Sequence, residues 1–140
     1  MNILITVKQA GKRRSRIAAV SFPLEHTPDT LRALITEAVH TCVTQYNGRI
    51  RRGEAAASPL SDTQMDAMSE IGKFSFGIPF NQKEADEAEA VQNAIQSFED
   101  GLYRIFLSDG ELTELDAPLS LHEGDHLTFI RLTMLTGSLF

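Results

Sequence analysis

Residues 119–137, LSLHEGDHLTFIRLTMLTG, decide the fold, because two different structures could carry this stretch. HEGDH matches the H-E-x-x-H pattern in which two histidines, one helical turn apart, bind Zn²⁺ while the glutamate activates water. That site requires a helix. Gly124 and Asp125 instead form a turn-type pair, and LTFIRLTM is rich in the β-branched and aromatic residues typical of strands. We therefore predict a turn and a strand, with His122 and His126 diverging and no metal or cofactor bound.

The predicted last strand has two different faces. Period-two alternation places Leu127 and Phe129 on the core side of the strand. The residues that then point outward are Thr128, Ile130, Leu132 and Met134. This outward face either lies under other parts of the chain or binds a partner, and both alternatives stay open.

The N-terminal part of the chain predicts a β-hairpin. Residues 3–7, ILITV, form the first strand, and residues 16–24 form the second. The predicted buried face of the second strand carries Ala18, Val20, Phe22 and Leu24. QAGKRRS lies between the strands, and its glycine permits a tight reversal with a basic tip.

A helix is predicted next, with Thr27 as its cap, Pro28 at its first position, Asp29 near its positive end and Gly48 as its stop. Its apolar stripe consists of Leu31, Leu34, Ile35, Ala38, Val39, Cys42, Val43 and Tyr46. Since Cys42 belongs to that stripe, we predict a core side chain and not a reactive thiol. His40 falls on another face and forms no dyad with it.

Residues 49–101 are predicted to form a loop over 49–60, a short helix from Ser61 to about Gly72, a weak strand over 73–80 and a second helix. Asn81 and Glu84 suggest a capping box for that second helix, and Gly101 its stop. Its apolar stripe would be Ala85, Ala88, Val91, Ala94, Ile95 and Phe98. After Gly101 the pattern is extended, with strands predicted over YRIFL, ELTEL, LSL and HLTFIRLTML.

The order of these elements resembles that of ubiquitin-like β-grasp proteins. The segments that carry the resemblance are MNILITV (1–7), TPDTLRALI (27–35), YRIFLSDGEL (103–112) and LSLHEGDHLTFIRL (119–132). The last segment is also similar to the sulfur carriers of thiamin and molybdopterin synthesis. The resemblance covers about residues 1–48 and 102–137. It implies one α+β domain over 1–140, a mixed sheet packed on a helix, with two extra helices inserted at about 49–101.

The C-terminus departs from the conjugated and sulfur-carrying relatives, which end in Gly-Gly so that the terminal carboxylate can be adenylated. In place of Gly-Gly this sequence has one glycine, Gly137, followed by Ser138-Leu139-Phe140. A protease would therefore have to remove three residues before such chemistry could begin.

Charge is distributed unevenly along the chain. Residues 1–52 carry nine basic and three acidic side chains, whereas 53–140 carry four and sixteen. The predicted basic patch consists of Lys12, Arg13, Arg14, Arg16, Arg49, Arg51 and Arg52. It is read as a solvated hairpin tip, with an acidic protein partner and a nucleic-acid backbone as alternatives. The acidic residues 84–89 either keep the surface soluble or meet a basic partner, another copy of the chain included.

Composition restricts the class of protein. A length of 140 residues with 42% hydrophobic content suits one packed core. The apolar runs are too short for a membrane span, and no secretory signal is evident, so we expect cytoplasmic residence. A single cysteine excludes an internal disulfide.

These patterns together predict a non-enzymatic, ubiquitin-like interaction module that recognises a protein partner through the outward face of the last strand or the apolar tail 135–140. One alternative is a modifier or carrier processed to Gly137. The other is a phosphate-backbone binder that uses the basic patch.

Overall fold

A computed structural model describes residues 1–11, 17–53, 71–72, 76, 83–108 and 110–132. Its strands are β1 (Asn2–Gln9), β2 (Ile17–Pro23), β3 (Tyr103–Leu107), β4 (Gly110–Leu112) and β5 (His126–Arg131). Its helices are α1 (Leu31–Arg51) and α3 (Glu87–Glu99). The predicted α+β class is confirmed. Within the described residues, neither helix is long and apolar enough to cross a membrane.

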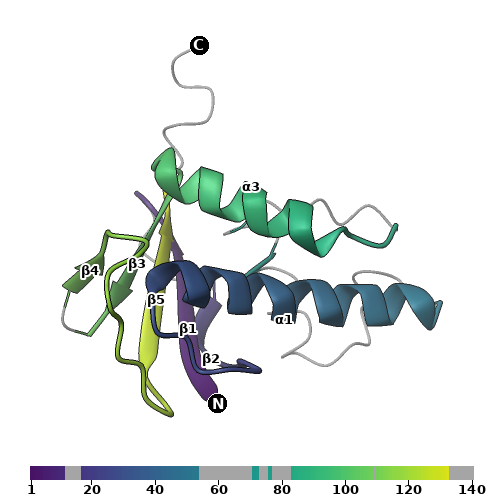
Figure 1. The fold of residues 1–140 in the computed structure, drawn as a ribbon, viewed down its shortest axis with the longest axis horizontal. Coiled ribbons are helices and arrows are strands. Elements are labelled where there is room, and N and C mark those ends of the chain that lie inside the picture. Colours follow the sequence, from purple (N-terminus) through teal and green to yellow (C-terminus); the bar gives the residue numbers. More distant parts are fainter. Residues whose placement is uncertain (12–16, 54–70, 73–75, 77–82, 109, 133–140) are drawn as a thin grey trace.

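The five strands form one mixed sheet in the order β2-β1-β5-β3-β4 (Figure 1). β1 and β5 pair in parallel at its centre, and the other neighbours pair antiparallel. The β1–β5 register sets Ile5 opposite Leu127 and Val7 opposite Phe129. Because paired residues point to the same side of a sheet, these four side chains share one face.

That face and α1 enclose the core. All eight positions predicted for the apolar stripe of the first helix are buried, as expected for a helix that covers a sheet. Cys42 is 2% exposed and burial raises the pKa of its thiol, so its predicted core position is confirmed. The strands contribute these side chains to the same core cluster as α1: Ile3, Ile5, Val7, Phe22, Tyr103, Ile105, Leu127 and Phe129.

The predicted start of the first helix is wrong by three residues. The cap is Thr30, whose Oγ1 accepts a hydrogen bond from Ala33 N at 3.0 Å. Thr30 itself is extended, with φ −142° and ψ 165°, and it bridges to Pro118, while Asp29 O accepts from Leu119 N. Thr27 therefore lies outside the helix.

At its other end, α1 runs through Gly48 to Arg51, so the loop predicted to begin at residue 49 is wrong there. Gly53 adopts a φ of +76°, a left-handed conformation that favours glycine, and ends the helix. The added turn brings the Arg51 guanidinium to Glu84 Oε1 at 2.8 Å. The two residues are far apart in sequence, so local sequence patterns do not reveal this contact.

The second helix predicted within residues 49–101 is present but begins later than expected. Residues 84–86 are not helical, and Asp86 caps α3 by accepting a hydrogen bond from Glu89 N at 3.1 Å. The buried positions of α3 are Ala90 and Ala94, whereas Ala88, which was predicted on the stripe, is exposed. The helix ends at Glu99, just before Gly101, as predicted.

The other insertion predictions lie largely outside the described residues. Ile71 and Gly72 have helical backbone, but the capping box at Ser61 falls outside the described ranges. Phe76 is the one described residue of the predicted strand 73–80, and it lies in a bend. Its ring packs edge-on against Tyr103 and Phe129, with centroids 5.9 and 5.7 Å away. It therefore extends the core on the α1 side of the sheet.

Two strand predictions need correction. Residues 119–121 form a connection and not a strand, although Leu121 is buried. In β2, the predicted alternation holds at Phe22 but fails at Ala18, which is exposed. The pairing with β1 shifts its register between Ile5 and Val7, where β2 has one residue more than β1, so a regular alternation does not continue through this part of β2.

Candidate functional site

The HEGDH segment forms the predicted turn before β5. Gly124 has a φ of +84°, and His122 N donates to Asp125 Oδ2 at 2.8 Å. His122 stays at the surface, with 76% of its side chain exposed. His126 instead places its Nε2 2.7 Å from Thr6 Oγ1. The two imidazoles thus have different partners, and among the described residues no group of three or more His, Cys, Asp or Glu is arranged to hold a metal ion.

The same turn fastens β5 to β1. Glu123 Oε1 accepts from Asn2 N at 3.0 Å, and Gly124 N donates to Asn2 O at 2.8 Å. Asp125 O accepts from Leu4 N at 2.8 Å, where the parallel ladder begins. HEGDH therefore sets the register of the central strand pair.

We define the outer sheet face as the side of the sheet opposite α1, and its centre is β5. Leu127 and Phe129 are fully buried, whereas Thr128 and Ile130 are partly exposed, which confirms the predicted alternation over 127–130. Leu132, just after β5, is also partly exposed. Met134 and Gly137, predicted in the same binding surface, lie outside the described residues.

The sheet register arranges the outer sheet face in rows. Thr128 pairs with Thr6 on β1 and with Phe106 on β3. In the next row, Ile130 pairs with Lys8 on one side and Arg104 on the other. An apolar side chain therefore lies between two cationic ones at the middle of the sheet.

Both cations of this row are exposed. The Arg104 side chain is 55% exposed and its Nε is 3.8 Å from Glu111 Oε2, a long surface ion pair. Such a pair contributes little and can be exchanged for another carboxylate. α1 and α3 lie on the other side of the sheet (Figure 1), so neither described helix covers this row.

Three of the seven residues predicted to form the basic patch are described by the structure: Arg49, Arg51 and Arg52. Lys12, Arg13, Arg14 and Arg16 lie outside the described residues. Arg49 is 1% exposed, which corrects its predicted place on an exposed patch. Because α1 continues past Gly48, Arg49 falls three residues after Tyr46 on the buried side of the helix. Arg51 is paired with Glu84, and Arg52 is exposed.

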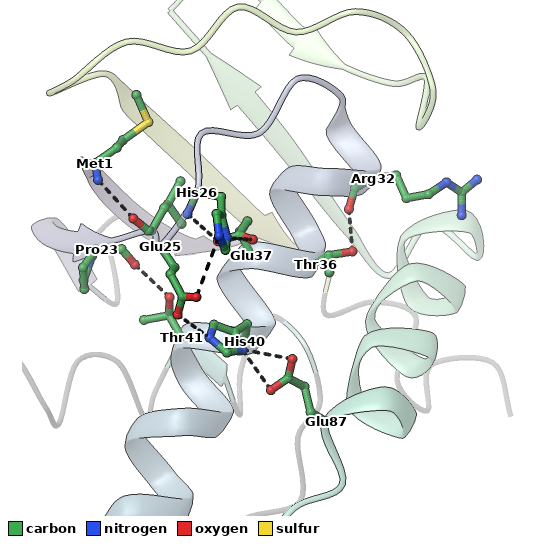
Figure 2. Close-up of polar contacts among 11 residues, drawn as sticks. Met1, Pro23, Glu25, His26, Arg32, Thr36, Glu37, His40, Thr41 and Glu87 are labelled. Atoms are coloured by element: carbon green, nitrogen blue, oxygen red, sulfur yellow. Dashed lines mark hydrogen bonds and ion pairs between the residues drawn. The ribbon is translucent and has the colours of Figure 1, made fainter.

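Sequence reasoning missed a polar cluster around His40 on α1. Its Nδ1 lies 2.9 Å from Glu87 Oε1, and its Nε2 lies 2.9 Å from Glu25 Oε2 (Figure 2). These carboxylates come from α3 and from the connection between β2 and α1. They are 47 and 15 residues from His40 in sequence, so only the fold brings them together. The sequence offered two separate signals: His40 lies off the apolar stripe of the first helix, and acidic residues gather at 84–89, at the start of a later helix.

Comparisons of this chain with protein-family models, with curated proteins and with solved structures found no match.

Proposed function

We propose that this chain is a ubiquitin-like β-grasp module, without catalytic activity, that binds a protein partner through the outer sheet face. The observation that carries the proposal is the row Lys8–Ile130–Arg104, in which a partly exposed isoleucine lies between two exposed cations.

Topology supports the β-grasp assignment. The chain begins with a hairpin, crosses one face of the sheet as α1, and later returns through β5, which lies parallel to β1 at the sheet centre. The hairpin, α1 and the strands β3 to β5 follow in the order noted from the sequence. In this assignment α3, which lies between α1 and β3 in the chain, would be an insertion that the simplest members of that superfamily lack.

The composition of the outer sheet face supports recognition of a protein. Aromatic and aliphatic side chains that are partly exposed at the middle of a surface, with charged residues around them, are typical of interface centres. Phe106 and Ile130 supply this apolar centre, and Lys8 and Arg104 flank it. The partner would present an apolar side chain with carboxylates on both sides, since such an arrangement complements the row in shape and charge.

Photo-crosslinking in the native host tests the proposal. A photoreactive phenylalanine analogue at position 130 should give one discrete adduct, whereas the same analogue at the exposed Gln92 of α3 should not. Binding of the purified partner should weaken more than about tenfold with Ile130→Asp, because central apolar side chains carry most interface energy. Lys8→Glu should slow association and make it less sensitive to salt.

The control variant is Gln92→Asp, which adds the same charge on a surface formed by α3. Thermal unfolding of each variant establishes that the sheet is intact. Equal crosslinking from positions 92 and 130, or a partner that binds Ile130→Asp as tightly as the unaltered chain, would refute the proposal. A self-adduct from position 130 would identify a second copy of the chain as the partner.

A further inference from the structure

His40 contacts two carboxylates at once, one through each ring nitrogen (Figure 2). Nδ1 lies 2.9 and 3.0 Å from the two oxygens of Glu87, and Nε2 lies 2.9 Å from Glu25 Oε2. Ionised carboxylates only accept hydrogen bonds, and a neutral imidazole carries one N–H. Both contacts therefore form together only when His40 is the imidazolium.

Among the described residues, three segments contribute charged groups to the cluster around His40: the connection after β2, α1 and α3. Glu25 comes from the connection after β2 and Glu87 from the first turn of α3. His26 Nε2 lies 3.9 Å from Glu25, and its Nδ1 lies 3.2 Å from Glu37 on α1. Three carboxylates thus face two imidazoles, and the protonation of His40 changes the charge balance of the whole group.

The chain that enters α3 is held to α1 by polar contacts along one helical stripe. Asn47 binds the backbone of Ala85 twice, with its amide nitrogen 2.9 Å from Ala85 O and its oxygen 2.7 Å from Ala85 N. Arg51 binds Glu84 at 2.8 Å. His40, Asn47 and Arg51 recur at helical spacing, so they face the same side. Of the three, only His40 changes its charge near neutral pH.

The far half of α3 has a different anchor. Ala94 is fully buried, and the hydroxyl of Tyr103 donates to Ala94 O at 2.8 Å inside the core. Burial raises the pKa of the Tyr103 phenol, so this hydrogen bond persists across neutral pH. The two ends of α3 therefore respond differently to pH.

We propose that Glu25, His40 and Glu87 form a proton-operated clasp, which joins the connection after β2 to the first turn of α3 when His40 is protonated and releases one of them when it is not. The neutral ring keeps a single N–H for one carboxylate and turns a lone pair toward the other. Whichever carboxylate keeps the N–H, deprotonation removes the ion pair between His40 and Glu87, which loosens the first turn of α3 and leaves the half anchored by Tyr103 in place.

The direction of the pH dependence follows from the contacts. Hydrogen bonds raise the pKa of His40 above its ordinary value of 6.5; the bond to Glu87 has the larger effect and the bond to Glu25 the smaller one. A group whose pKa is higher in the folded than in the unfolded chain stabilises the fold fully below the unfolded value. Its contribution is lost as the pH rises through the raised value. The clasp is thus closed in mildly acidic solution and opens as the solution becomes alkaline.

Titration of the assigned His40 ring resonances by NMR tests the clasp. The midpoint should lie above 6.5 and shift downward in both Glu87→Gln and Glu25→Gln, with the larger shift in Glu87→Gln. Both glutamates are well exposed, at 44% and 61%, so these variants should fold. Glu89→Gln is the matched control, since it removes the same charge from the same turn of α3 without a contact to His40, and should leave the midpoint nearly unchanged.

A second measurement reports the motion itself. Amide hydrogen-exchange protection of residues 89–92, corrected for the intrinsic effect of pH, should fall as His40 deprotonates, while that of residues 95–99 should hold. A midpoint at or below 6.5, a midpoint that neither Gln variant lowers, or protection of 89–92 that is constant through the titration would each overturn the proposal.

Discussion

Thr6 on β1 and His126 at the start of β5 are joined by a hydrogen bond between side chains, with Oγ1 2.7 Å from Nε2. The same hydroxyl accepts from Ala19 N at 3.0 Å, beside the bulge in β2. One side chain, 7% exposed, therefore links three strands from the outer side of the sheet.

Replacing Thr6 with valine keeps the shape and removes the hydroxyl. We expect the free energy of unfolding to fall by about 1–3 kcal/mol, because Ala19 N and His126 each lose a partner at a partly buried site. Urea denaturation measures the change. Thr6→Ser retains the hydroxyl and should lose less; equal losses in the two variants would show that the methyl group and not the hydrogen bonds matters.

Leu34 on α1 is fully buried between the helix and the sheet. Leu34→Ala should destabilise the chain by about 2–5 kcal/mol, the cost of lost burial and a residual cavity. Thr44→Ala, on the exposed side of the same helix, should change stability by less than about 0.5 kcal/mol. A Leu34→Ala variant with an unchanged denaturation midpoint would contradict the packing of α1 on this sheet.

The two threonines before α1 distinguish the observed cap from the predicted one. Thr30→Ala removes the acceptor for Ala33 N and should cost about 1 kcal/mol, as N-cap losses do. Thr27→Ala should be close to neutral, since Thr27 is exposed and precedes the helix. Thermal unfolding of the two variants, measured under the same conditions, shows which threonine caps the helix. A larger loss of stability in Thr27→Ala than in Thr30→Ala would place the cap at Thr27.

The two glycines near the end of α1 should respond to alanine with opposite signs. Gly48 is inside the helix, so Gly48→Ala should stabilise the chain by about 0.5–1 kcal/mol. The new Cβ would lie 3.3 Å from Arg52 Nη1, the tip of a long side chain that can shift.

Gly53 has a φ of +76°, and no atom beyond its immediate chain neighbours lies within 4 Å of a Cβ placed there. Gly53→Ala should therefore destabilise the chain only through backbone strain, by about 1–2 kcal/mol. The denaturation midpoints of the two variants, compared with that of the unaltered chain, measure both changes in stability. Stabilisation by Gly53→Ala would mean that the helix does not end in this conformation.

The sequence predicted best what depends on local periodicity. The stripe from Leu31 to Tyr46 and the alternation over 127–130 both follow from burial of one side of a regular element, and both are confirmed. The Gly124 turn was also predictable, because glycine and aspartate favour that backbone conformation whatever surrounds them.

Contacts between distant segments explain what the sequence missed. Thr27 had every local property of a cap, but Thr30 bridges to Pro118 in an extended conformation, so the helix begins only after Thr30. Arg49 looked like a surface cation only while α1 was assumed to end at Gly48. The contacts of His40 join three segments whose neighbourhood no spacing rule describes.

The parallel pairing of β1 with β5 also affects when this chain can fold during its synthesis. Thr6 and His126 are 120 residues apart, so the central ladder lacks one of its strands until the residues of β5 have been synthesised. At about 5–20 residues per second, β1 waits on the order of 6–24 s for its neighbour. During that interval the β1–β2 hairpin has one unpaired edge of buried-type residues, Ile3, Ile5 and Val7 among them, and α1 is its nearest cover. Early docking of α1 onto the hairpin would therefore protect the nascent chain from aggregation while the last strand is still in the ribosome.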